Sequence, residues 1–142
     1  HLDFSLVWAT HRCARSFLFK IYDDMPRDGL LDIISTKDVP LRPIFYYGIF
    51  FESLAYFHFA RQTDGDDYHR KGEAAIKFFR NLSRKSKWNF ENKYLILEAE
   101  MMHCSGYHQQ ASQLYEDAVR SANEHKFIHE EAIASELAGM HL

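Results

Sequence analysis

The sequence contains few of the residues that build small cross-linked or irregular domains. Its 142 residues include two cysteines, three prolines and six glycines. Cys13 and Cys104 are far apart and form no C-x-x-C pair, so neither a disulfide framework nor a zinc finger is predicted, and a reducing, cytoplasmic setting is expected. The scarcity of proline and glycine argues against a disordered or low-complexity chain.

The sequence also lacks a convincing membrane span. Its most apolar run, Ile44 to Ala60, is at the short limit for crossing a bilayer and contains Glu52 and His58. We therefore predict a buried helix there and no membrane partner. The chain is 46% hydrophobic and 15% aromatic, which suits one domain with a sizeable core.

Charge is distributed unevenly along the chain, although the net charge is only −3. Residues 70–87 hold seven basic residues and one acidic residue, a net charge of +6, whereas residues 88–142 hold three basic and nine acidic residues, a net charge of −6. The basic stretch could contact phosphates or an acidic protein surface, but a solvated helix face is favoured. Nucleic-acid binding is not expected, because the whole domain is not basic and its sequence pI is about 6.3.

Apolar residues recur at three- and four-residue spacing over most of the chain, which predicts an all-α fold of about six helices. Asn89 is the expected N-cap of the fourth helix, and Gly106 is expected to end it. The predicted apolar stripe of the third helix consists of Ala74, Ala75, Phe78, Phe79 and Leu82. The expected helices span Phe4–Tyr22, Pro43–Arg61, Asp67–Lys85, Trp88–Cys104 and Ala111–Ala122, and a sixth begins near Ile128.

The helices are expected to form antiparallel pairs within a single helical-repeat segment, 1–142, of a longer protein. The chain begins with His1 rather than Met, which is why a longer parent is expected. The predicted parts are a lone helix at 1–22, a connector at 23–43 with one short turn at Leu30–Ile34, hairpins at 44–87 and 88–125, and the start of a third hairpin at 126–142.

A shift of 36 positions aligns similar residues of the third and fifth helices and predicts a repeat. It places Ala75 on Ala111, Phe79 on Tyr115 and Leu82 on Ala118. Small side chains allow close helix approach, so these positions are expected to pack the hairpins together. The predicted packing residues are Ala75, Phe79, Ala99, Gly106, Ala111, Tyr115 and Ala118.

Gly106, Ala111, Tyr115 and Ala118 resemble the turn and second half of a tetratricopeptide repeat. The unit is degenerate, because Asn123 stands where a proline would close it. Residues 88–139 are similar to the tetratricopeptide-like region of very large signalling proteins, which carry a protein-kinase-like domain and an ATPase module before the helices and often a sensor histidine kinase after them. This resemblance implies a right-handed superhelix, a regulatory scaffold role and protein partners.

In tetratricopeptide arrays the first helix of each pair lines the concave surface. The resemblance therefore implies that partner-binding residues lie on the fourth and sixth helices, although intramolecular stacking is an equally good role for them. The candidate positions are Lys93, Ile96, Glu100, His103, His129 and Glu136.

Possible chemical motifs are incomplete. His103, Cys104 and His108 lie close in sequence, but Gly106 is expected to separate them, and the i,i+4 pair His125 and His129 spans a predicted helix break. HEEAIASE has Ile133 where a zincin motif needs a second histidine, and no ATPase P-loop or kinase H-R-D motif is present. We therefore predict no catalytic residue, metal or cofactor. The alternatives are a free-standing peptide-binding adaptor and a small helical metal-binding or enzymatic domain.

Overall fold

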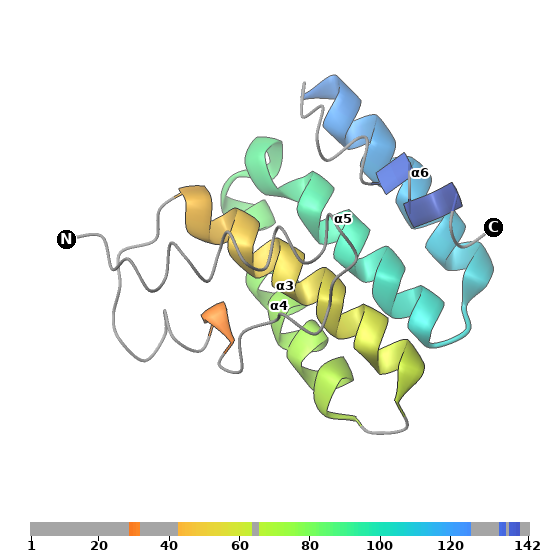
Figure 1. Cartoon of the computed structure of the whole chain (residues 1–142). Helices are drawn as coiled ribbons and strands as arrows, with labels where there is room; N and C mark the ends of the chain where they lie inside the picture. Colours follow the sequence, from red (N-terminus) through yellow and green to blue (C-terminus); the bar gives the residue numbers. More distant parts are fainter. Residues whose placement is uncertain (1–28, 32–42, 64–65, 126–133, 136, 140–142) are drawn as a thin grey trace.

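The described residues of the computed structural model are 29–31, 43–63, 66–125, 134–135 and 137–139, and they contain helices and no strand. The four long helices alternate in direction, so that α3 and α4 form one antiparallel hairpin and α5 and α6 form the next (Figure 1). The expected helix at 4–22 lies outside the described residues. The long helices are α3 (Pro43–Gln62), α4 (Asp67–Lys85), α5 (Lys87–Cys104) and α6 (His108–Glu124).

The predicted and observed helices agree closely at most ends. α3 ends one residue later than expected, and α4 has the predicted bounds. The predicted N-cap of α5 is wrong, because the helix begins at Lys87 and the non-helical residue before it is Ser86. The Asn89 side chain lies in the first turn and donates a hydrogen bond back to Ser86 Oγ at 2.9 Å. Ser86 is also the single residue that separates α4 from α5.

Gly106 ends α5 through its backbone conformation. Its φ of 87° lies in the left-handed region, where residues with a Cβ are disfavoured. The Gly106 N–H donates to the His103 carbonyl at 3.1 Å, and the Tyr107 N–H donates to the Met102 carbonyl at 2.9 Å. These two bonds form a Schellman motif, which satisfies the last carbonyls of α5 and turns the chain into α6.

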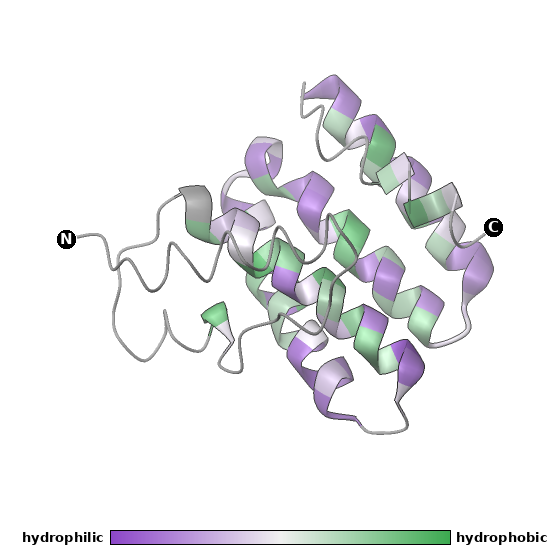
Figure 2. Ribbon diagram, in the orientation of Figure 1, coloured by the Kyte–Doolittle hydropathy of each residue, from purple (hydrophilic) through white to green (hydrophobic). Residues whose placement is uncertain are grey.

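The core lies between α3 and the facing sides of the other helices. α3 is apolar around most of its circumference and packs against both α4 and α5, whereas polar positions are frequent along α6 (Figure 2). Ala134 and Leu137 are also buried in this core. The largest fully buried side chains are Tyr115, Phe45, Phe50, Phe57, Phe79, Leu30, Ile49, Leu54, Ile76, Ile96 and Leu97.

The buried face of α4 is rotated from the predicted stripe. Ala75 and Phe79 are buried as predicted and Phe78 and Leu82 are partly buried, but Ala74 is exposed, and the buried face also includes Gly72 and Ile76. This set follows three- and four-residue spacing and suits a helix that packs against both α3 and α5. Gly72 permits the close approach to α3, because a Cβ there would lie 2.5 Å from the Phe57 ring.

The two hairpins recur at a longer interval than the 36-residue sequence match. α3 and α5 begin at residues 43 and 87, which are 44 positions apart, and α4 and α6 begin at 67 and 108, which are 41 positions apart. Ala75 lies eight residues after the first residue of α4 and Ala111 three residues after the first residue of α6, yet both are buried. The sequence match therefore identifies equivalent faces and not equivalent positions.

We expect Trp at Ala111 or Ala118 to destabilise the fold. Both alanines are buried on α6, at 1% and 0% exposure, in the contact with α5. Overpacking such a contact costs about 1–3 kcal/mol, so each variant should melt several degrees lower by circular dichroism. Gln113→Trp on the exposed side of α6 is the matched control and should melt near the parent temperature. Unchanged melting in both alanine variants would contradict the close packing of α5 and α6.

Candidate functional site

The predicted partner-binding positions on α5 are largely covered by the chain itself. Lys93, Ile96 and Glu100 are at most 3% exposed, and His103 is half-buried. α3 packs on α5, with the Tyr47 ring 4.8 Å from Lys93 Nζ and Arg61 Nη1 2.5 Å from Glu100 Oε2, so a partner would have to displace side chains of α3 to reach Lys93 and Glu100. His129 and Glu136 lie outside the described residues. Partner binding at these six positions stays a prediction.

The predicted packing positions lie at the helix contacts. The structure buries the side chains on both hairpins, and Gly106 occupies the turn between α5 and α6. The buried members are Ala75, Phe79, Ala99, Ala111, Tyr115 and Ala118.

A partly buried ion pair, with a hydrogen bond to its carboxylate, joins three helices at the end of α3. Arg61 Nη1 of α3 lies 2.5 Å from Glu100 Oε2 of α5, and Tyr115 Oη of α6 donates to Glu100 Oε1 at 2.9 Å. Burial raises the pKa of Tyr115, and the neighbouring Glu100 raises it further, so the phenol stays protonated and donates. In the sequence, this site was indicated by Glu100, a glutamate in a helix whose apolar residues surround most of its circumference. Residue spacing did not identify Arg61 as its partner.

Cys104 and His58 lie beside this ion pair and could suggest a catalytic cluster. Arg61 Nη1 donates to Cys104 Sγ at 3.6 Å, and the thiol donates to the Phe57 carbonyl at 3.4 Å. Burial raises the pKa of Cys104 despite the opposing effect of Arg61, and burial with Arg61 lowers the pKa of His58. A protonated thiol is a poor nucleophile, so these contacts favour a structural role.

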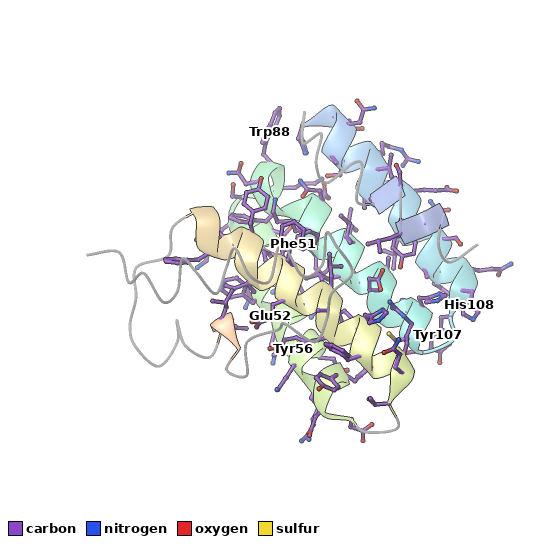
Figure 3. All side chains as sticks on the ribbon, in the orientation of Figure 1. Phe51, Glu52, Tyr56, Trp88, Tyr107 and His108 are labelled. Atoms are coloured by element: carbon purple, nitrogen blue, oxygen red, sulfur yellow. The ribbon has the colours of Figure 1, made fainter. Side chains whose placement is uncertain are left out.

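A second buried carboxylate anchors residues 29–31 to α3. Glu52 Oε1 and Oε2 accept the Leu30 N–H at 2.9 and 3.0 Å, and Tyr56 Oη donates to Glu52 Oε1 at 2.9 Å. Figure 3 shows Glu52 and Tyr56 one helical turn apart on α3. The carboxylate that interrupts the apolar run therefore makes hydrogen bonds inside the protein. Among the described residues, no helix is both long enough and apolar enough to cross a bilayer.

The histidines of the α5–α6 turn pair with each other. His103 Nδ1 and His108 Nδ1 are 3.0 Å apart, and Tyr107 between them is exposed (Figure 3). Cys104 does not join them, because its thiol bonds to Phe57. In the part of the chain that the structure describes, no three His, Cys, Asp or Glu side chains form a metal-binding group. His125 packs on Trp88 with ring centroids 4.2 Å apart, and His129 lies outside the described residues.

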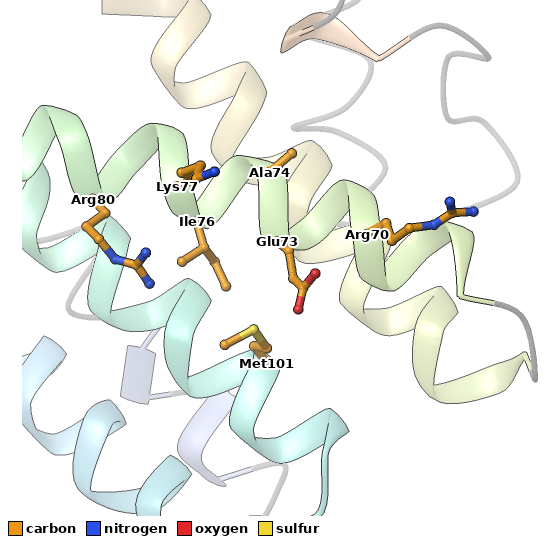
Figure 4. Close-up of a pocket in the computed structure, with 7 residues that line it drawn as sticks. All are labelled: Arg70, Glu73, Ala74, Ile76, Lys77, Arg80 and Met101. Atoms are coloured by element: carbon orange, nitrogen blue, oxygen red, sulfur yellow. The ribbon is translucent and has the colours of Figure 1, made fainter.

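A basic groove of about 440 Å³ lies between α4 and α5 (Figure 4). Arg80, Ile76 and Glu73 extend from α4 toward α5, and Met101 lies opposite them. The Arg80 guanidinium lies 5.6 Å from the Tyr94 ring centroid and donates to Tyr94 Oη at 3.4 Å. The groove is lined by Arg70, Glu73, Ala74, Ile76, Lys77, Arg80 and Met101.

Removing Arg61 should destabilise the protein strongly. Arg61→Ala leaves the Glu100 carboxylate buried without its cation, which costs about 3–5 kcal/mol. In the double variant with Glu100→Gln, the loss should be smaller than the sum of the single losses, because the uncompensated charge is absent. Urea unfolding measures the free energy of unfolding of the parent protein and of each variant. Arg70→Ala breaks the exposed pair with Asp67 and should change stability by about 0.5 kcal/mol or less. Additive single losses would contradict the coupling.

Cys104 should react slowly in the native protein. In a Cys13→Ser background, alkylation by iodoacetamide at pH 8 should be at least about tenfold slower than in urea, because burial shields the thiol and keeps it protonated. Because the pKa of Cys104 is higher in the folded state than in the unfolded state, the protonated thiol contributes to stability below about pH 8.5. This contribution is lost as the pH rises through the folded-state pKa. Equal native and denatured rates would instead indicate an activated cysteine.

The comparison with known proteins identifies no relative. No protein-family model matches the chain, and no curated protein or solved structure is significantly similar to it. The resemblance to tetratricopeptide-like regions therefore stays a prediction, and the contacts and charges of the described residues are the basis for a functional proposal.

Proposed function

We propose that this segment is a non-catalytic, tetratricopeptide-like scaffold that mediates protein–protein or interdomain contacts in a multidomain signal-transduction protein. The observation that supports the proposal best is the order of the helix contacts. α3 packs on α4 and α5, and α5 packs in turn on α4 and α6. Such stacking of successive helical hairpins is typical of arrays in which each unit contacts its neighbours. A right-handed superhelix is part of this proposal.

The use of the polar side chains also supports a scaffold. Glu100, Arg61 and Tyr115 are residue types that serve in catalysis, but here they bond to one another across three helices. The neighbouring Cys104 thiol has a raised pKa, which is the opposite of the change that activates a nucleophile. These contacts favour a structural role, in which the side chains hold the hairpins together, over a catalytic role.

The proposed setting is the cytoplasm, within a parent protein that carries kinase-like, ATPase or histidine-kinase modules. The segment needs no cofactor in this role, and its proposed partners are proteins: other domains of the same chain or a separate protein. Neither nucleic acid nor membrane is a proposed partner.

The full-length transcript provides the first test. We expect its reading frame to encode an ATPase module before this segment or a histidine-kinase core after it. A reading frame that starts and stops close to these residues would contradict the multidomain role and favour a free-standing adaptor.

A replacement in the parent protein would then separate scaffolding from catalysis. Exchanging residues 43–125 for a flexible Gly/Ser linker should abolish stimulus-dependent output and leave basal catalytic activity intact, because the linker cannot transmit rigid contacts. The parent protein with Ala118→Trp is a control of intermediate severity, because this substitution weakens the packing of the α5–α6 hairpin without removing the hairpin. Loss of basal activity in the linker variant would assign a catalytic role to the segment and contradict the proposal.

A further inference from the structure

The groove between α4 and α5 combines positive charge with an apolar floor. Ile76 is only 2% exposed and points toward Met101 (Figure 4), and the lining also includes three cationic residues, Arg70, Lys77 and Arg80, of which Arg80 extends toward α5. One carboxylate, that of Glu73, also lines the groove. The groove residues therefore provide an excess of positive charge beside a small hydrophobic contact surface.

The positive charge of the groove is only partly neutralised by the rest of the described chain, in which Asp67 pairs with Arg70 and the carboxylate of Glu98 helps to raise the pKa of Arg80. Arg70 pairs with Asp67, but both side chains are more than 70% exposed, so the pair is weak. Within the described residues no carboxylate forms an ion pair with Lys77, and the same is true of Arg84 and Lys85 farther along α4. An anionic partner would therefore gain electrostatic attraction without first breaking a strong ion pair.

Arg80 is held in position before any partner binds. Its guanidinium stacks near the Tyr94 ring and bonds to the Tyr94 hydroxyl, which fixes the side chain beside the junction of α4 and α5. A positioned guanidinium loses less conformational entropy when it binds a carboxylate, so Arg80 is suited to recognise one acidic side chain.

The lining of the groove fits a peptide better than a nucleic acid. Glu73 is 54% exposed and would repel a continuous phosphate backbone, whereas a peptide can place its acidic residues near the arginines and away from Glu73. The floor consists of Ile76 and Met101 and offers no aromatic ring on which a base could stack. An apolar peptide side chain would be accommodated by the same two residues.

We propose that the α4–α5 groove binds an acidic peptide segment through Arg70, Lys77 and Arg80, with an apolar side chain of that peptide over Ile76 and Met101. This inference rests on the proposed scaffold function, because it names the chemistry of one protein partner. It places the partner on the outer junction of two hairpins and not on the α5 face that α3 covers.

Fluorescence anisotropy of the 142-residue chain with labelled synthetic peptides would test the proposal. The probe is a short Asp/Glu-rich peptide with a central leucine, and the matched peptides replace the leucine by serine or all acidic residues by lysine. The acidic leucine peptide should bind, the serine peptide should bind about tenfold more weakly, and the lysine peptide should not bind. Affinity should fall as salt rises from about 50 to about 300 mM, because the contacts are partly electrostatic.

Charge reversal at matched positions would locate the site. Arg70→Glu with Lys77→Glu changes two exposed residues of the groove, and Arg84→Glu with Lys85→Glu makes the same charge change outside it on the same helix. The groove variant should weaken binding at least about tenfold and the control less than about threefold, with unchanged circular dichroism and melting. Equal weakening in both variants would overturn the groove in favour of a diffuse charged surface.

Two further results would overturn the inference. One is the absence of peptide binding, and the other is tighter binding of a single-stranded oligonucleotide than of the acidic leucine peptide. Neither result bears on the domain content of the parent transcript or on the linker replacement, so failure of the groove and failure of the scaffold proposal are distinguishable.

Discussion

The Arg61–Glu100 ion pair is the contact on which the arrangement of the helices depends. It joins the end of α3 to α5, and the Tyr115 hydroxyl brings α6 to the same carboxylate. Apolar packing alone tolerates several rotations of one helix against another, but a buried carboxylate with fixed donors does not. The pair therefore sets the relative position of the two hairpins, while the surrounding phenylalanines and leucines supply most of the burial.

This use of polar groups has a consequence for function. The Arg61, Glu100 and Tyr115 side chains lie at least partly inside the protein and bond to one another, whereas exposed cations line the outside of α4. In the proposed scaffold role, such a protein would interact through its surface charge and shape. The structure thereby separates the residues that maintain the fold from those that are accessible to a partner.

Local signals in the sequence predicted much of the fold. The bounds of α4, the start of α3 at Pro43 and the end of α5 before Gly106 follow from spacing, proline and glycine, which act over a few residues. The predicted N-cap of α5, Asn89, was wrong because both serine and asparagine are favoured at N-caps, and only the backbone conformation distinguishes Ser86 from Asn89.

Features that depend on distant contacts were not predicted. Arg61 and Glu100 are 39 positions apart, and no periodicity pairs them. The exposure of Ala74 and the burial of Lys93 both result from how α3, α4 and α5 pack. Residue spacing alone therefore did not show that Lys93, on the expected binding face of α5, is buried. In the sequence, the groove was indicated only by the excess of basic residues at 70–87, because its floor combines Ile76 and Met101 from different helices.

The single-residue connection at Ser86 also couples the groove to the relative orientation of the two hairpins. α4 belongs to the first hairpin and α5 to the second, so a ligand that contacts both is sensitive to the angle between the hairpins. By thermodynamic linkage, a ligand that prefers one angle stabilises that angle, and a force that changes the angle changes the affinity for the ligand. A ligand of the proposed groove would thus make the angle between the two hairpins depend on the concentration of that ligand.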